Sequence, residues 1–274
     1  MKVKILASES MGVRSMATFI KTDDVGIIID PSCTLCPRRF GLPPHKLEIE
    51  EREKRLRTIN AYLKLSDIAI ITHYHYDHFT NENAELYENK TLLAKDPLNF
   101  SHAGLMQRAK KFFSLLNENT HIKIADNKTY KFGHTEIVFS GPLHHGNKTS
   151  KVYVLSVCIK NKGTVFLHTS DIQGINTEEQ LDFITKCQPD ILFLDGFPLY
   201  LIGKYYTKAD FENSVNLLTV AARHTQTLII DHHFTRSEEF RNLLPESIQF
   251  VTAATFMNEK EKLLEARRKE LYSL

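Results

Sequence analysis

The sequence predicts an α/β fold in which two β-sheets pack face to face and helices cover their outer surfaces. Short β-branched apolar runs, such as the one within Val25–Asp30, are typical of strands buried on both faces. In both halves of the chain such runs are followed by helical patterns, and side chains that bind metals stand at strand ends. We therefore expect a four-layer αβ/βα sandwich of two mixed β-sheets flanked by helices, with residues 1–274 forming one domain.

The first half of the chain supplies one sheet and three helices. Its expected strands are Lys2–Ala7, Ala17–Lys21, Val25–Asp30, Ile68–Ile71 and Thr91–Ala94. Prolines and a glycine forbid regular structure over Pro31–His45. Helices are expected over Lys46–Leu65, Asn81–Glu88 and Pro97–Leu116, where apolar residues recur at helical spacing and Pro97 suits a first turn.

The second half of the chain adds further strands and helices. Its expected strands are Ile122–Ile124, Lys128–Lys131, Glu136–Phe139, Val152–Ile159, Thr164–His168, Asp190–Asp195, Leu228–Asp231 and Gln249–Thr252. Thr177 and Gln180 form a capping-box pattern at the start of a helix that runs to Lys186. Further helices are expected over Lys208–His224, from Ser237 and from Asn258.

Four potential metal ligands follow the apolar run Ile68–Ile71 directly. They are His73, His75, Asp77 and His78, in the order His-x-His-x-Asp-His. One histidine at a strand end is usually a solvated or core residue, but four ligand types in this order rarely arise by chance. Imidazole and carboxylate groups suit zinc and similar divalent ions, so the segment predicts a metal site.

The segment THYHYDH resembles the signature of the metallo-β-lactamase superfamily, and the whole chain resembles an archaeal branch of predicted metal-dependent hydrolases within it. The resemblance implies the αβ/βα sandwich and two bound divalent ions. Zinc is expected, with manganese and iron as alternatives. The motif is specific for the superfamily and leaves the substrate open.

The resemblance also implies a ligand set. The first ion would be held by His73, His75 and His145, the second by Asp77, His78 and His233, and Asp171 would bridge them. Asp30 would support the motif from behind. Two histidines are doubled, so His144 is the alternative to His145 and His232 the alternative to His233, and the unused partner would support the ligands or contact substrate.

These ligands imply a hydrolase in which a metal-bound hydroxide, oriented by Asp77, attacks an ester or phosphodiester of a small anionic substrate. Arg38, Arg39 and His45 follow a strand that ends at the site, and they are expected to bind the substrate. The alternative is that the two arginines pair with acidic residues of the following helix.

Other function classes remain open on the same residues. One is a nuclease or RNA-processing phosphodiesterase, which the net charge of only +2 does not favour. Another is a non-catalytic metal-binding protein. A third is di-iron redox chemistry, which is disfavoured because the redox members of the superfamily tend to have glutamate at the position of His75.

Composition indicates a cytoplasmic protein with reduced thiols. No apolar run is long enough to cross a bilayer, and the start MKVKILASES lacks the apolar centre of a signal peptide. Four cysteines are too few for a disulfide framework. Cys33-x-x-Cys36 is interpreted as two thiols of a loop, with half a zinc site as the alternative.

Overall fold

The fold is organised around two mixed sheets. The computed structural model describes residues 1–100, 102–223 and 225–273. The first sheet contains, in spatial order, β1 (Lys2–Ile5), β2 (Thr18–Lys21), β3 (Gly26–Ile29), β4 (Ile68–Ile71), β5 (Thr91–Ala94) and β6 (His121–Ile124). The second contains β14 (Thr227–Asp231), β13 (Ile191–Asp195), β12 (Thr164–His168), β11 (Val157–Asn161), β8 (Thr135–Phe139) and β7 (Thr129–Phe132). The short strands β9 (Leu143–His144) and β10 (Tyr153–Val154) pair antiparallel in a separate two-stranded sheet.

In each sheet an antiparallel part adjoins a parallel part. The pairs from β3 to β6 are parallel in the first sheet, and the pairs β12–β13 and β13–β14 are parallel in the second. The carboxyl ends of parallel neighbours meet at one sheet edge, so side chains that follow these strands are brought together. This edge holds the candidate site described below.

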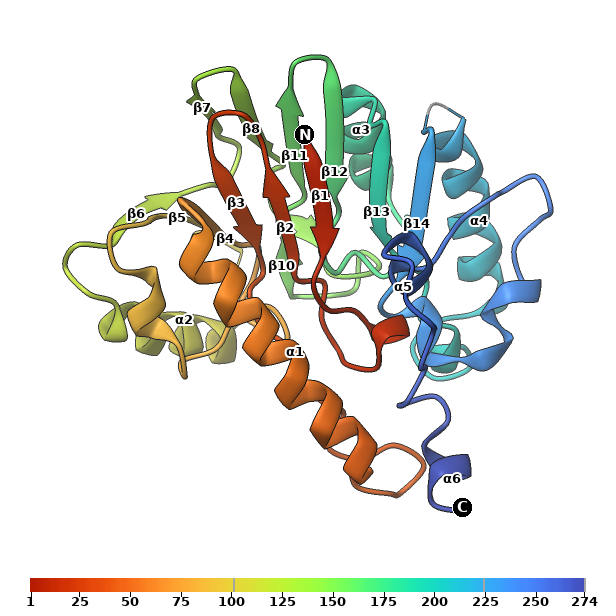
Figure 1. Cartoon of the computed structure of the whole chain (residues 1–274). Coiled ribbons are helices and arrows are strands. Elements are labelled where there is room, and N and C mark those ends of the chain that lie inside the picture. The colour runs from red at the N-terminus through yellow and green to blue at the C-terminus, as the bar shows by residue number, and fades with distance from the viewer. Residues whose placement is uncertain (101, 224, 274) are drawn as a thin grey trace.

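Three apolar cores separate four layers. Residues such as Ile29, Ile70 and Phe193 fill the space between the two sheets. A second core packs the first sheet against α1 (Lys46–Leu65) and α2 (Ala103–Leu115), and a third packs the other sheet against α3 (Glu178–Cys187) and α4 (Lys208–Ala222). Figure 1 shows α1 and α2 beside the strands of the first sheet and α3 and α4 beside β12, β13 and β14. The predicted αβ/βα sandwich is confirmed.

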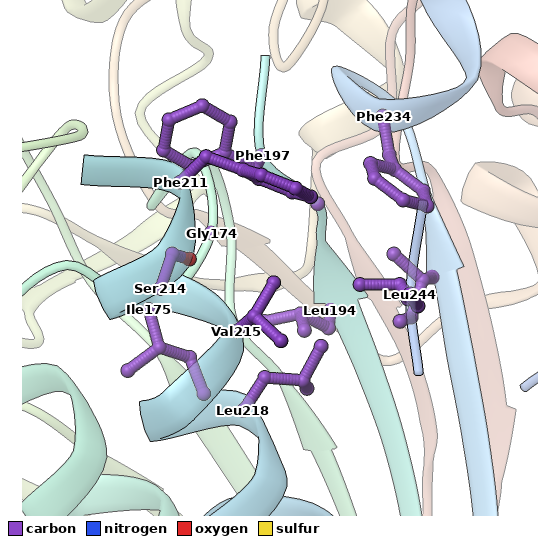
Figure 2. A pocket seen from close by; sticks show the side chains of 12 residues that line it. Gly174, Ile175, Leu194, Phe197, Phe211, Ser214, Val215, Leu218, Phe234 and Leu244 are labelled. Carbon is purple, nitrogen blue, oxygen red and sulfur yellow. The ribbon is translucent and has the colours of Figure 1, made fainter. Parts of the chain in front are cut away.

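Helix α4 packs closely on β13 and β14. Figure 2 shows apolar side chains that meet around a cavity of only about 10 Å³ there. A Cβ atom added to Gly196 would lie 2.4 Å from the Cβ of Phe234 and 2.6 Å from Cγ2 of Ile230. Glycine is therefore required at position 196, where the chain leaves β13 toward the candidate site.

The C-terminal segment returns to the first half of the chain. Helix α6 (Arg268–Leu271) lies near the start of α1 (Figure 1). The buried guanidinium of Arg268 donates from Nε and Nη2 to the two carboxylate oxygens of Glu48, at 2.8 and 2.7 Å. This pair, both members of which are at most 1% exposed, ties the end of the chain to α1.

Several helices differ from the sequence prediction. Helix α2 begins at Ala103 rather than Pro97, because His102 Nδ1 accepts from the Gly104 N–H and caps the helix there, and Leu98 is 78% exposed instead of inward. Over 81–88 only the 3₁₀ helix η2 (Ala84–Tyr87) forms.

The last third of the chain is also less regular than expected. The helix expected from Ser237 is the 3₁₀ helix η5 (Glu238–Asn242), and the strand expected over 249–252 is a single bridge between Val251 and Ile229. No helix begins at Asn258, whose φ of 55° is left-handed; α5 (Ala253–Phe256) ends before it. The expected end of α4 at His224 lies outside the described residues.

None of the helices formed by the described residues has the length and apolar character needed to span a membrane.

Candidate metal centre

The motif loop is attached to the first sheet through Asp30. This fully buried carboxylate follows β3, and it accepts from the N–H of Thr72 at 2.8 Å and from the Thr72 hydroxyl at 2.7 Å. Its Oδ2 atom also lies 2.7 Å from Nδ1 of His78. Asp30 thus fixes the direction of the His78 ring and leaves Nε2 directed toward the other candidate ligands.

A first group of candidate ligands consists of His73, His75, His145 and Asp171, whose ligand atoms all lie within 4.8 Å of one another. Oδ2 of Asp171 lies 3.7 Å from Nε2 of His73 and 3.4 Å from Nε2 of His145. His144 lies outside this group, because its Nδ1 faces the Ser150 carbonyl at 3.0 Å and its ring packs on Tyr153. The structure therefore places His145, rather than His144, among the candidate ligands.

A second group consists of Asp77, His78, Asp171 and His232, again with ligand atoms within 4.8 Å. Here the other oxygen of Asp171 takes part: Oδ1 lies 3.0 Å from Nε2 of His78 and 3.4 Å from Nε2 of His232. Nε2 of His232 is also 3.7 Å from Oδ2 of Asp77. Asp171 thus turns one carboxylate oxygen toward each group.

The histidine pair His232–His233 differs from the expectation, because His232 rather than His233 lies in the second group. His233 is already hydrogen-bonded at both ring nitrogens. Its Nδ1 lies 2.9 Å from Oδ1 of Asp195, and its Nε2 lies 3.1 Å from Nε2 of Gln173. Since Tyr206 donates to Oε1 of Gln173 at 2.7 Å, the Gln173 amide nitrogen donates to His233 Nε2, whereas His232 lies with Asp77, His78 and Asp171 in the second group.

The backbone decides which histidine of the doublet faces the ligands. His232 directly follows β14 and has a φ of 58°, a left-handed conformation that changes the direction of the chain. Three other residues that follow strands at this edge have positive φ as well: Asp30 at 49°, Ser170 at 56° and Gln173 at 54°. Such conformations cost free energy and occur where surrounding contacts impose them, which is common at functional sites.

Burial and charge set the protonation of the candidate ligands. Burial, reinforced by His78, lowers the pKa of His73 well below its ordinary value, and burial lowers the pKa of His75 to about 4. Burial opposes the charged form of His78, but the carboxylates of Asp171 and Asp30 hold its pKa well above the ordinary value. His73 and His75 are therefore neutral, the form in which imidazole binds a metal.

Two buried polar atoms in the centre of the site indicate that a cation fits between the groups. Nε2 of His78 and Oδ1 of Asp171 have no hydrogen-bond partner of suitable geometry, although both are buried. Buried polar groups in this state are uncommon and costly unless something else binds them. A divalent cation would satisfy both atoms, and neutral imidazoles with carboxylates are the donors such ions accept.

A cavity of about 610 Å³ opens onto both groups. It is lined by Arg14, Thr34, Leu35, Pro37, His75, Tyr76, Asp77, Arg108, His145, Asp171, Tyr200, His233 and Arg236. Asp77 thus lies between the candidate ligands and the open space, where its carboxylate can reach a bound water. The side chain is 14% exposed.

The residues predicted to bind substrate do not line this cavity. Arg38 is exposed elsewhere on the loop, and His45 caps α1 by accepting from the Leu47 N–H. Arg39 does not reach the cavity either; its guanidinium stacks on the cavity residue Tyr200, 4.6 Å from the ring centroid. It does not pair with the acidic residues of α1 either; its carboxylate neighbour is Glu265, at 3.9 Å.

Sequence reasoning missed Arg14, Arg108 and Arg236 as cavity residues. Only Arg236 had a sequence signal, since it follows His233 closely along the chain. Cys33 and Cys36 are buried with free thiols whose Sγ atoms face the carbonyl oxygens of Arg52 and Arg38. Among the described residues, no cysteine belongs to a group that could hold a metal.

Three solved structures have a similar fold. A diphosphatase of the PhnP family matches with a TM-score of 0.54 and 17% identity, covering 91% of this chain and 93% of that one. Zinc-bound PqqB from Methylobacterium extorquens matches with a TM-score of 0.55 and 13% identity over 92% and 97%. An isothiocyanate hydrolase from Delia radicum gut bacteria matches with a TM-score of 0.52 and 15% identity over 81% and 83%. These likenesses assign the metallo-β-lactamase fold.

Sequence relatives cover the whole chain, although no family model matches it. The UPF0282 protein MJ1629 of Methanocaldococcus jannaschii is 43% identical over 99% of this chain and 96% of its own length. A UPF0282 protein of Korarchaeum cryptofilum is 36% identical over 100% and 95%. The chain belongs to the UPF0282 family of archaeal proteins and has the metallo-β-lactamase fold.

Proposed function

We propose that this protein is a dinuclear metal-dependent hydrolase that cleaves an ester or phosphodiester of a small anionic substrate. The observation that supports it most is the position of Asp171 between two ligand groups, with Oδ2 toward His73 and His145 and Oδ1 toward His78 and His232. A carboxylate shared in this way suits two cations held close together, and zinc is the ion we propose, with manganese and iron as alternatives.

The proposed ligands of the first ion are His73, His75 and His145, and those of the second are Asp77, His78 and His232, with Asp171 shared. Ions bound there would lower the pKa of a water and polarise the oxygen of the bond to be cleaved. The remaining chemistry is assigned to residues of the chain. Asp77 lines the cavity, so it can accept a hydrogen bond from the attacking water and take up its proton.

Two outer carboxylates keep the rings in place. Asp30 accepts from His78 Nδ1 at 2.7 Å, and Asp195 accepts from His233 Nδ1 at 2.9 Å. Partners of this kind fix the tautomer of a histidine and the direction of its ring. His233, held between Asp195 and Gln173, is a wall residue of the cavity in this proposal and not a ligand.

The size of the cavity supports a small substrate over a nucleic-acid chain. Its volume of about 610 Å³ lies within the range of roughly 300–1,000 Å³ typical of small-molecule sites. We propose that the whole chain acts as one hydrolase domain around this cavity.

The test is a parallel assay of bis(4-nitrophenyl) phosphate, a lactone and a thioester with protein of measured metal content. We expect hydrolysis of at least one of them, and we expect it to disappear in His73→Ala together with bound metal. Metal-loaded protein that cleaves none of the three classes would contradict the proposed hydrolysis. Activity that His73→Ala retains would place the chemistry elsewhere.

A further inference from the structure

The cavity is lined by several positive charges in addition to the candidate ligands. Arg14, Arg108 and Arg236, together with Tyr200, line it, and we call these four residues the arginine wall. They come from distant parts of the chain. A guanidinium group carries only donors and a positive charge, so the three arginines suit an anion and not a cation.

Arg236 is the fixed centre of the arginine wall. Only 2% exposed, it donates from Nε to Oε2 of Glu9 at 3.1 Å and from Nη1 to the Tyr200 hydroxyl at 3.0 Å. Its Nη2 also donates to the His232 ring, at 3.0 Å from Nε2 and 3.4 Å from Nδ1. Because the Tyr200 oxygen accepts from Arg236, its own O–H remains available to a group in the cavity.

Two of the three arginines of the wall have a carboxylate partner. Arg14 donates to both oxygens of Glu265 at 2.6 Å, and Arg236 donates to Glu9, while Arg39 behind them is only within 3.9 Å of the same Glu265. Arg14 and Arg236 of the wall thus each have a glutamate partner, and Arg39, which does not line the cavity, shares Glu265 with Arg14.

Arg108 adds an unpaired positive charge at the cavity. Its guanidinium lies over the Tyr76 ring, 4.4 Å from the centroid, and Nη1 faces the Tyr74 carbonyl at 3.5 Å. Within the described part of the chain, no carboxylate lies within ion-pair distance of it. Because Arg108 is half-buried and lines the cavity, its guanidinium is available to pair with an anion bound there.

We propose that the arginine wall binds a second anionic group of the substrate, a carboxylate or a phosphate, in addition to the ester that is cleaved. Guanidinium groups bind both oxyanions in a planar, two-pronged geometry, and Tyr200 supplies a further donor. The inference rests on the proposed function for the statement that this anion belongs to a substrate. It names the substrate class: small esters or phosphodiesters that also bear an acidic group within the same cavity.

The first test measures anion binding and requires no turnover. Succinate and inorganic phosphate are titrated calorimetrically into the purified, metal-containing full chain and into Tyr200→Phe, Arg14→Gln and the control Arg57→Gln. Arg57 is an exposed arginine of α1 whose side chain is 73% exposed. We expect Tyr200→Phe and Arg14→Gln to weaken binding of the preferred anion about tenfold, the effect of one hydrogen bond to a charged group, and Arg57→Gln to have no effect.

Each outcome of this test decides something. Preference for succinate or for phosphate identifies the acidic group. Equal affinities in the wild type, Tyr200→Phe and Arg14→Gln would overturn the inference, as would the absence of binding to the wild type. Binding that is lost in His73→Ala but retained in Tyr200→Phe and Arg14→Gln would assign the anion to the metal centre and would also overturn it. Tyr200→Phe, which retains the ring, remains informative if Arg14→Gln fails to fold.

The second test compares 4-nitrophenyl acetate with mono-4-nitrophenyl succinate, which has the same leaving group and an added carboxylate. Tyr200→Phe should raise KM for the succinate ester about tenfold while changing KM for the acetate far less. An equal change for both esters would contradict the inference. If anion binding depends on the arginine wall but no ester, lactone, thioester or phosphodiester is cleaved, the proposed hydrolase function fails and the anion subsite stands.

Discussion

Replacing Asp30 by asparagine would reverse the hydrogen-bond polarity behind His78. Oδ1 of Asp30 accepts from the Thr72 backbone N–H, which can only donate, so the side-chain oxygen of the introduced asparagine must take that position. The amide NH₂ group then occupies the position of Oδ2, where it faces the Thr72 hydroxyl and Nδ1 of His78. The hydroxyl can adapt by rotation, but His78 must accept at Nδ1 and carry its proton on Nε2.

The consequence is a ring in the wrong tautomer for metal binding. With a proton on Nε2, His78 cannot offer that nitrogen to a cation next to Oδ1 of Asp171, 3.0 Å away. Changes to such outer partners typically weaken metal affinity about 10- to 100-fold. This corresponds to about 1.4–2.7 kcal/mol at one ion of the pair, with the other ion's ligands unchanged.

Metal content and affinity measure this effect directly. Elemental analysis after gel filtration should show Asp30→Asn folded but approaching one bound ion per chain where the wild type holds two. The control is Asp24→Asn, at the opposite end of β3, where Asp24 accepts from the His134 N–H at 3.0 Å and the Thr135 hydroxyl at 2.8 Å. It should retain the wild-type metal content. Wild-type metal affinity in Asp30→Asn would refute the tautomer argument.

Three further predictions concern the second doublet, pH and packing. His232→Ala should lower the metal content by about one ion per chain, whereas His233→Ala should retain both ions, and elemental analysis of the two variants would reject the ligand assignment if the results were reversed. Burial lowers the pKa of His75 from 6.5 to about 4, so between these pH values the unfolded chain binds a proton that the folded chain does not. The free energy of unfolding of the metal-free protein, measured by urea titration, should therefore decrease as the pH falls from 6.5 to about 4. His75→Gln should make this decrease smaller. Gly196→Ala should destabilise the fold by about 1–3 kcal/mol, because the new Cβ would lie 2.4 Å from Phe234. Gly104→Ala in α2, where the nearest atom is 3.4 Å away, should not destabilise it. Equal thermal unfolding temperatures of the two variants would contradict the packing argument.

Much of the fold could be predicted because apolar periodicity is a local property. The helix α1 has the predicted bounds, and strands such as β4 and β5 lie where their apolar runs predicted them. The prediction of helix ends failed where one side-chain cap or one backbone angle decided where a helix begins. His102 caps α2 well beyond Pro97, and a positive φ at Asn258 prevents the expected last helix.

The binding wall could not be predicted from the sequence for a different reason. Arg38 and Arg39 are adjacent to a strand end, and nearness along the chain suggested that they reach the site. The cavity instead takes Arg14 from the loop before β2, Arg108 from α2 and Arg236 from the turn after β14. Long side chains from distant segments meet there only because the two sheets pack face to face.

The sequence by itself determined the chemistry of this protein: neutral imidazoles and carboxylates at the carboxyl ends of buried strands, ordered as His-x-His-x-Asp-His with later partners at strand ends. Only the tertiary structure decided which member of the second doublet faces the centre and which arginines face the cavity. The physical reason is that side-chain direction beyond a strand end depends on backbone angles, such as the φ of 58° at His232, that long-range contacts impose. Asp231 shows this dependence, since it accepts from Ser8, Ser10 and Ala253, which are remote in sequence and hold the turn that presents His232.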